Sequence, residues 1–174
     1  IGGSFMKPSA AGQLAALNQS YKEMEHIYHW YARRHGLSDA HLWLLYSLYE
    51  SQSHTQREIS SIWHYPPQTV NSALKSLERK GLILLEDVPG NKRNKRVALS
   101  GRGTTLAREI IHPLICAEQR AIQSLGEAET DALVALTGKY TELLQAELAK
   151  QGAQPTHTAG AAGIDRSRNR GKEA

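Results

Sequence analysis

Apolar positions recur at helical spacing near the start of the chain. The first set is separated alternately by three and four residues: Leu14, Leu17, Tyr21, Met24, Tyr28 and Tyr31. This heptad-like pattern predicts one face of a long amphipathic helix. Gly36 follows and is typical of a helix end. We expect this face to pack against its own chain or against a helix of a partner.

Three shorter helices are predicted next. Ser38 can cap a helix that runs to about Glu50, and Thr55 and Glu58 have the spacing of a capping box that starts another. Pro67 suits the first position of a third helix, which ends before Gly81. The buried stripe of this third helix comprises Val70, Ala73, Leu74 and Leu77. Its other side is polar and nearly free of acids.

A hairpin and two more helices complete the pattern. Residues 82–87 and 96–100 are predicted strands, because a Pro-Gly turn signal lies between them. The tip, residues 91–95, is basic. Residues 101–125 and 127–150 are predicted helices, and one side of the last is apolar: Leu133, Leu136, Tyr140, Leu143 and Leu144.

The two ends of the chain differ from the middle. Residues 151–174 hold a single large aliphatic residue, Ile164, so we expect a disordered tail. Residues 1–9 form an N-terminal extension, of which residues 1–5 precede Met6 and are interpreted as a cloning remnant.

Composition bounds the class of protein. A length of 174 residues suits one domain with a tail. The single cysteine, Cys116, excludes a disulfide scaffold and a four-thiolate zinc site, and its apolar flanks favour a buried thiol. No apolar run approaches a membrane span and no signal-peptide pattern is present, so we expect a cytoplasmic protein. The histidines form no compact ligand cluster, so neither a metal nor another cofactor is expected.

Charge is concentrated in the middle of the chain. The formal net charge is +4, but residues 79–108 carry +6 and residues 109–150 carry −4. A local basic cluster is the electrostatic footprint of nucleic-acid binding, although a solvated basic loop is the simpler alternative.

The order of elements indicates a winged helix-turn-helix. A helix with a polar face fits the major groove, where base edges present distinct donors and acceptors. The preceding short helix then lies at the DNA backbone, and a basic hairpin can reach phosphates or the adjacent minor groove. The predicted fold class is therefore mainly α with a small β-hairpin wing.

Several stretches in this order resemble the MarR (multiple antibiotic resistance regulator) family of transcription factors. They are Thr55-Gln56-Arg57-Glu58-Ile59, Gln68-Thr69-Val70-Asn71, Leu77-Glu78-Arg79-Lys80-Gly81-Leu82-Ile83, Asn91-Lys92-Arg93-Asn94-Lys95-Arg96 and Leu99-Ser100-Gly101-Arg102-Gly103. With its flanking helices, the resemblance covers about residues 10–150.

The resemblance implies a homodimer that binds double-stranded DNA and represses transcription. Residues 10–36 and 104–150 would form the dimerisation helices, and residues 37–103 the DNA-binding domain. Each subunit would read half of a pseudo-palindromic operator, with the two recognition helices roughly 34–36 Å apart.

The resemblance also assigns site residues. The recognition helix would use Pro67, Gln68, Thr69, Asn71, Ser72 and Lys75. The wing would use Lys92, Arg93, Lys95 and Arg96, with Arg93 entering the minor groove. Asn91 and Asn94 stand where the family often has aspartates that orient the wing arginine. We therefore expect a more cationic and less constrained wing.

A small aromatic effector is a further expectation, because many relatives are released from DNA by aromatic acids. The candidate pocket residues are His29, Trp30, Tyr31, Trp43 and Tyr46.

Other functional classes stay open. One is a winged-helix module for protein contacts only, whose DNA affinity would not fall steeply with salt. Another is a metal- or redox-sensing regulator of the same fold. An enzyme is not expected, since the chain has no phosphate-binding loop or HExxH motif.

Overall fold

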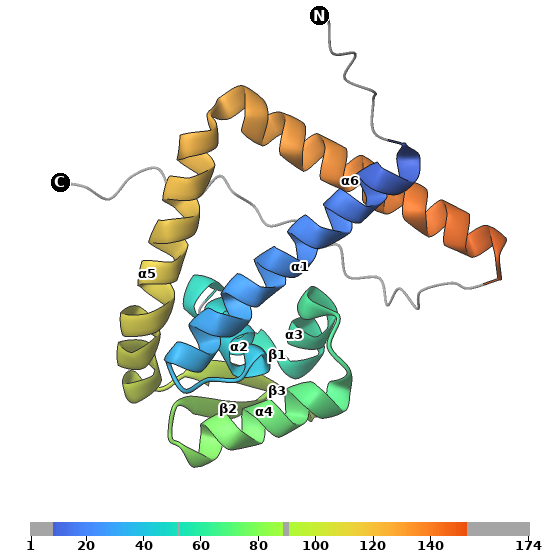
Figure 1. Cartoon of the computed structure of the whole chain (residues 1–174). Coiled ribbons are helices and arrows are strands. Elements are labelled where there is room, and N and C mark those ends of the chain that lie inside the picture. Colours follow the sequence, from blue (N-terminus) through green and yellow to red (C-terminus); the bar gives the residue numbers. More distant parts are fainter. Residues whose placement is uncertain (1–8, 52, 89–90, 153–174) are drawn as a thin grey trace, which may run out of the picture.

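The structure is a computed structural model that describes residues 9–51, 53–88 and 91–152 (Figure 1). The N-terminal extension before Ser9 and the predicted tail beyond Gly152 lie outside the described residues.

The first two helices begin at serine caps. α1 spans Ala10–Arg34, and the Ser9 side chain accepts a hydrogen bond from the backbone of Gly12. α2 spans Asp39–Ser51, and the Ser38 hydroxyl accepts one from the backbone N–H of His41 at 3.3 Å. Both helices agree with the prediction. Each serine accepts a hydrogen bond from a backbone N–H at the helix start that otherwise has no partner.

The helix-turn-helix follows. α3 spans Gln56–Trp63 and starts with the predicted capping box, in which Thr55 and Glu58 each accept from the other's backbone N–H. His64 adopts the left-handed conformation, with φ of 50°, and ends α3. α4 spans Pro67–Arg79, with Pro67 at its first position. A one-residue left-handed stop followed by a proline start gives the sharp turn between the two helices.

The sheet has three antiparallel strands in the order β1-β3-β2. β2 spans Ile83–Val88, β3 spans Asn91–Leu99 and β1 spans Ser53–Thr55. Two expectations are corrected. The returning strand begins at Asn91 rather than Arg96, because the backbone of the expected tip pairs with β2 after a register irregularity at Asp87/Val88. The predicted hairpin also gains β1, whose His54 pairs with Val97.

The core lies between these elements. The largest fully buried side chains are Leu42, Leu44, Leu45, Leu48, Ile59, Leu77, Ile111, Val70 and Val97. They come from α2, α3, α4, β3 and α5, the helix spanning Gly101–Leu125. Helices α2, α3 and α4 thus share one core with the sheet and with the first half of α5, which holds the winged-helix body together.

The second half of α5 leaves this body. Its last buried residue is Leu114, and residues beyond Gln119 are exposed. α6, spanning Glu127–Lys150, buries no residue. Figure 1 shows α5 rising from the body and α6 turning back across the top of the view. None of the helices in the described ranges combines the length and apolarity needed to cross a membrane.

Candidate nucleic-acid interface

α4 presents a polar face to solvent. Val70, Ala73, Leu74 and Leu77 are buried as predicted, which fixes the rotation of the helix. That rotation exposes Pro67, Gln68, Thr69, Ser72 and Lys75, while Asn71 is partly buried. None of the polar side chains in this set has a hydrogen-bond or ion-pair partner among the described residues. The face is therefore available to an external partner.

A groove of about 460 Å³ runs along this face, between α4 and the start of α2. Gln68, Thr69 and Ser72 line one wall. Ser38 and His41 line the other, and sequence reasoning did not include them in the site. They lie about thirty residues from α4 along the chain, so only the packing of α2 on α4 reveals their position.

His41 is the titratable group of the groove. Its Nδ1 lies 2.9 Å from the Ser38 hydroxyl, and its Nε2 is buried without a partner among the described residues. Burial lowers the pKa of His41, and the nearby Lys80 charge lowers it further. The neutral imidazole is therefore favoured at the contact between α2 and α4.

The wing lies beside α4. In the paired register Asp87 faces Lys95 and Glu86 faces Arg96. Lys95 is exposed and its Nζ lies 3.9 Å from Asp87 Oδ1, a long contact that leaves the ammonium accessible. Lys92 and Arg93 lie on the β3 backbone, but their side chains are outside the described set. The prediction that Arg93 probes a minor groove is therefore not tested.

Exposed cations surround this region. Besides Lys75 and Lys95, the exposed basic residues on α3, β3, the end of α4 and the start of α5 include Arg57, Arg79, Lys80, Arg96 and Arg102. Arg57 occupies the first turn of α3, the first helix of the helix-turn-helix. The polar face of α4 and its basic surroundings can therefore bind a polyanion while contacting specific polar groups.

None of the five residues predicted for an effector pocket lines the α4 groove. His29 Nδ1 lies 3.0 Å from Asp39, Trp30 stacks under the Arg34 guanidinium, and the Tyr31 hydroxyl donates to the Ile110 carbonyl at 2.7 Å. Trp43 and Tyr46 instead join an aromatic cluster. A larger cavity of about 610 Å³ lies elsewhere, where the end of α4 meets the start of α5. The pocket stays a prediction.

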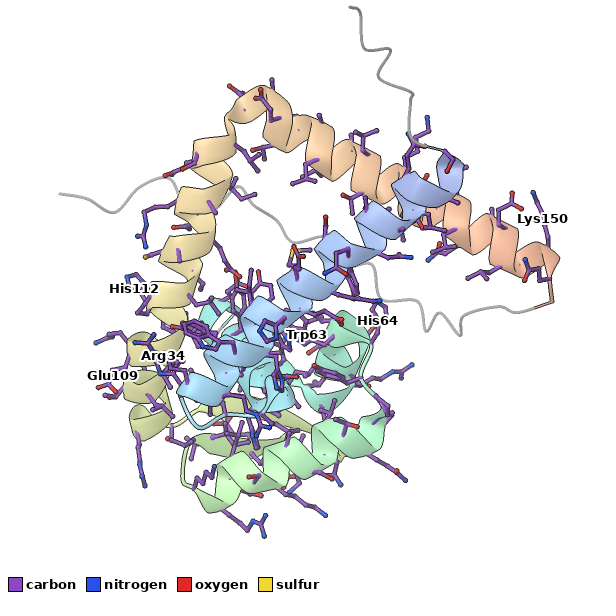
Figure 2. All side chains as sticks on the ribbon, in the orientation of Figure 1. Arg34, Trp63, His64, Glu109, His112 and Lys150 are labelled. Carbon is purple, nitrogen blue, oxygen red and sulfur yellow. The ribbon has the colours of Figure 1, made fainter. Side chains whose placement is uncertain are left out.

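The aromatic cluster lies where α1, α2 and α3 meet. The Trp43 ring lies 4.8 Å from Tyr28, 5.7 Å from Tyr46 and 4.5 Å from Trp63, measured between centroids. Trp63 donates from Nε1 to the Ser47 hydroxyl. Figure 2 shows Trp63 near the middle of the molecule, below α1. The partly buried cluster is a packed joint between helices.

The single cysteine has a neighbour that the sequence flanks did not suggest. Cys116 Sγ lies 3.6 Å from His112 Nε2, one helical turn earlier on α5. The thiol is partly buried. In the part of the chain that is described, no three His, Cys, Asp or Glu side chains come close enough to hold a metal ion.

Comparisons with known proteins bear on this geometry. Residues 35–94, which run from just before α2 to the first residues of β3, match the model of the MarR family. The chain has the MarR-family fold. The resemblance predicted from sequence motifs is thus confirmed, as is the mainly helical winged-helix class. No curated protein sequence matches the chain closely enough to count as a relative.

Solved structures extend the shared fold beyond the matched segment. The MarR family regulator NMB1585 from Neisseria meningitidis is 22% identical, with a TM-score of 0.71 over 80% of this chain and 98% of that chain. A putative MarR family transcriptional regulator from Listeria monocytogenes, complexed with a 26mer DNA, is 23% identical, with a TM-score of 0.64 over 87% and 100%. The S. aureus MepR–DNA complex is 24% identical, with a TM-score of 0.63 over 75% and 96%.

These findings establish the fold of the chain. The chain has the fold of MarR-family transcriptional regulators, and some proteins with this fold are solved bound to DNA. Proteins of the family are transcription factors rather than enzymes.

Proposed function

We propose that the chain is a cytoplasmic, homodimeric repressor that binds a pseudo-palindromic operator and is released by a small-molecule effector. The observation that carries this proposal is the partner-free polar face of α4 beside a basic wing. In a winged helix-turn-helix this face is the part that enters the major groove.

Each residue of the interface has a proposed role. Gln68 and Asn71 carry amides that can pair with adenine edges, and Thr69 and Ser72 can bind bases or phosphates. Lys75 binds phosphate, since it lies farther along the helix from the bases. Arg93 enters the minor groove, and Lys92, Lys95 and Arg96 supply the surrounding positive charge.

Homodimerisation is supported by apolar side chains that this chain leaves exposed. They lie on α1, the end of α5 and α6: Leu14, Leu17, Tyr21, Met24, Ile27, Ile122, Leu125, Leu133, Val134, Leu136, Tyr140, Leu143, Leu144 and Leu148. Soluble monomers rarely expose so large an apolar set, so a partner is needed to cover it.

A second copy of the chain is the proposed partner. α1, all but the first three residues of α5, and α6 lie within residues 10–36 and 104–150, the segments that the family resemblance assigns to dimerisation. A two-fold arrangement would cover the apolar set of each subunit with that of the other, and would present the residues 37–103 of each to one half-site.

The repressor role and the effector rest on the family resemblance alone. The proposed effector is a small aromatic acid near His29, Trp30, Tyr31, Trp43 and Tyr46. It would act by binding more tightly to the arrangement of the dimer that cannot engage DNA.

Selection of binding sites tests the proposal. The purified full chain is incubated with random-sequence duplex DNA, and the retained sequences are determined over successive rounds. We expect a consensus of two inverted half-sites about one helical turn apart, centre to centre. Retention without enrichment of any sequence would contradict an operator-specific regulator. Absence of DNA retention at low salt would favour the protein-contact module.

A further inference from the structure

One carboxylate joins three helices in the described part of the chain. Glu118 of α5 accepts a hydrogen bond from the Tyr28 hydroxyl of α1 at 2.7 Å and another from the Tyr46 hydroxyl of α2 at 2.8 Å. The two tyrosines lie 90 and 72 residues away along the sequence. Each oxygen of the carboxylate has its own donor, so the angle between the three helices is constrained at this point.

The donors keep their protons across the physiological range. Burial raises the pKa of Tyr28 to about 12, and the hydrogen bond to Glu118 contributes. The pKa of Tyr46 is raised further by the same causes. No Lys, Arg or His of the described residues forms an ion pair with Glu118. Among the described residues, the two tyrosine hydroxyls are therefore its hydrogen-bond partners.

The joint extends to the helix-turn-helix through the aromatic cluster. Tyr28 and Tyr46 both pack on Trp43, and Trp43 stacks on Trp63 of α3 with an interplanar angle of 25°. A shift of Glu118 would therefore be passed on to the helices that position α4. Packed aromatic rings transmit such a shift because they leave little free volume.

The position of Glu118 along α5 allows its contacts to restrict the tilt of that helix. Leu114 is the last buried residue of that helix, and Glu118 lies one turn farther from the winged-helix body. Beyond it the helix is exposed and leads to α6. A contact at the outer end of the packed segment restricts the tilt of α5 more than an equal contact near its start, because the same displacement corresponds to a smaller angle.

We infer that Glu118 is a positioning residue that fixes the tilt of the winged-helix body against α1 and α5, and thereby the half-site spacing that the dimer accepts. The inference rests on the proposed homodimeric DNA binding. Glu118 need not touch DNA. The angle at which α1 and α5 hold the winged-helix body in each subunit sets the distance between the two recognition helices of a dimer.

The variants are chosen to remove the joint without removing the core. Glu118→Gln keeps the shape of the side chain but offers one acceptor oxygen in place of two. Tyr28→Phe and Tyr46→Phe each delete one donor. Glu109→Gln is the matched control, because Glu109 is an exposed glutamate on α5 with no hydrogen-bond partner among the described residues.

The first measurement is affinity for the selected operator and for versions with one base pair added or removed between the half-sites. We expect the wild type and Glu109→Gln to lose about tenfold or more on either altered operator. The Glu118 and tyrosine variants should lose about threefold or less, because a looser joint accepts several spacings. An unchanged spacing profile with only a lower melting temperature would show a merely structural role and overturn the inference.

The second measurement needs no DNA. Spin labels are attached at Lys75→Cys in a Cys116→Ser background, and the distance between the two recognition helices of a dimer is measured by pulsed electron resonance. A single narrow distribution is expected for the wild type and for Glu109→Gln, and a broadened one for Glu118→Gln. Equal widths would overturn the inference. A wild type without any interchain distance would instead overturn the proposed dimer.

Discussion

At the scale of single residues, Gly103 decides how closely α5 approaches the sheet. A Cβ atom at this position would overlap the carbonyl oxygen of Leu82, the residue that precedes β2. The Ser100 hydroxyl accepts from the Gly103 backbone and donates to the Gly81 carbonyl, so the start of α5 cannot shift independently. The absence of a side chain is therefore required here for close packing rather than for an unusual φ.

Replacing Gly103 by alanine should destabilise the fold. We expect the free energy of unfolding to fall by about 1–3 kcal/mol, because the methyl group forces backbone atoms apart. Gly101→Ala is the control, since a Cβ there would meet nothing within 4 Å. Urea unfolding of the two variants tests this. Equal stabilities would contradict the packing account of Gly103.

His41 gives a second prediction, on pH. The folded chain holds the pKa of His41 below its ordinary value, through burial and the Lys80 charge, so the unfolded chain binds the proton more tightly. The contribution of His41 is complete above the ordinary histidine pKa of about 6.5 and is lost as the pH falls through the lower folded value.

Replacing His41 by a residue that does not titrate isolates its contribution to the pH dependence of stability. His41→Gln should lose less stability than the wild type when the pH is lowered from about 8 to about 5. Thermal unfolding at several pH values measures the difference. Parallel pH profiles for the two proteins would show that His41 does not titrate on unfolding in this range.

At the scale of elements, the helices were predictable because their signals are local. Caps at Ser38 and Thr55, Pro67 at the start of α4 and the apolar periodicity all lie within the segments that they define. β1 was missed because three polar residues carry no strand pattern and pair with β3 more than forty residues later. The start of β3 was misplaced because its basic residues resemble a loop.

The candidate nucleic-acid interface was predictable to a similar degree. The polar face of α4 followed from its buried stripe, and the exposure of Gln68, Thr69 and Ser72 agrees with it. The groove wall formed by His41 was not predictable, nor was the Glu118 joint. Both depend on contacts between segments that are distant in the sequence, and a single sequence carries no local signal for such contacts.

α4 and the wing should differ in what they contribute to DNA binding. Gln68→Ala or Asn71→Ala should lose about 1–3 kcal/mol of discrimination between the selected operator and random DNA, if their amides contact bases. Arg93→Ala should weaken binding to both DNAs alike and reduce the salt slope by about one. Fluorescence anisotropy titrations measure both quantities.

Glu78→Ala is the control for these variants, because Glu78 is exposed near the opposite end of α4. It should leave discrimination unchanged. Equal losses on operator and random DNA for the Gln68 and Asn71 variants would contradict their assignment as base readers.

At the scale of the whole molecule, α6 is the element on which the proposed dimer most depends. It buries no residue in the single chain, and Figure 2 shows Lys150 at its end, far from the winged-helix body. A long helix with an uncovered apolar side is not stable in water without a partner. The molecule that binds DNA should therefore be the dimer, in which α1, α5 and α6 of both copies cover one another.

A charge on the apolar side of α6 should dissociate the dimer. Leu136, whose side chain is 66% exposed in the single chain, would be desolvated in the interface, so Leu136→Asp should yield monomers. Ala135→Asp adds the same charge on the opposite side of the helix and should leave the dimer intact. Sedimentation velocity separates the two results. Dimers of both variants would place the interface elsewhere.

The proposed function is tested most directly by measuring how the dimer's affinity for DNA depends on sequence and on salt. The full chain is titrated onto its selected operator and onto random DNA at about 50 mM and about 200 mM salt, with the stoichiometry determined by sedimentation. We predict one dimer per operator, operator affinity well above random affinity at both salts, and a loss on the order of a hundredfold on random DNA over this interval. Equal, salt-insensitive affinity for both DNAs, or one monomer per operator, would contradict it.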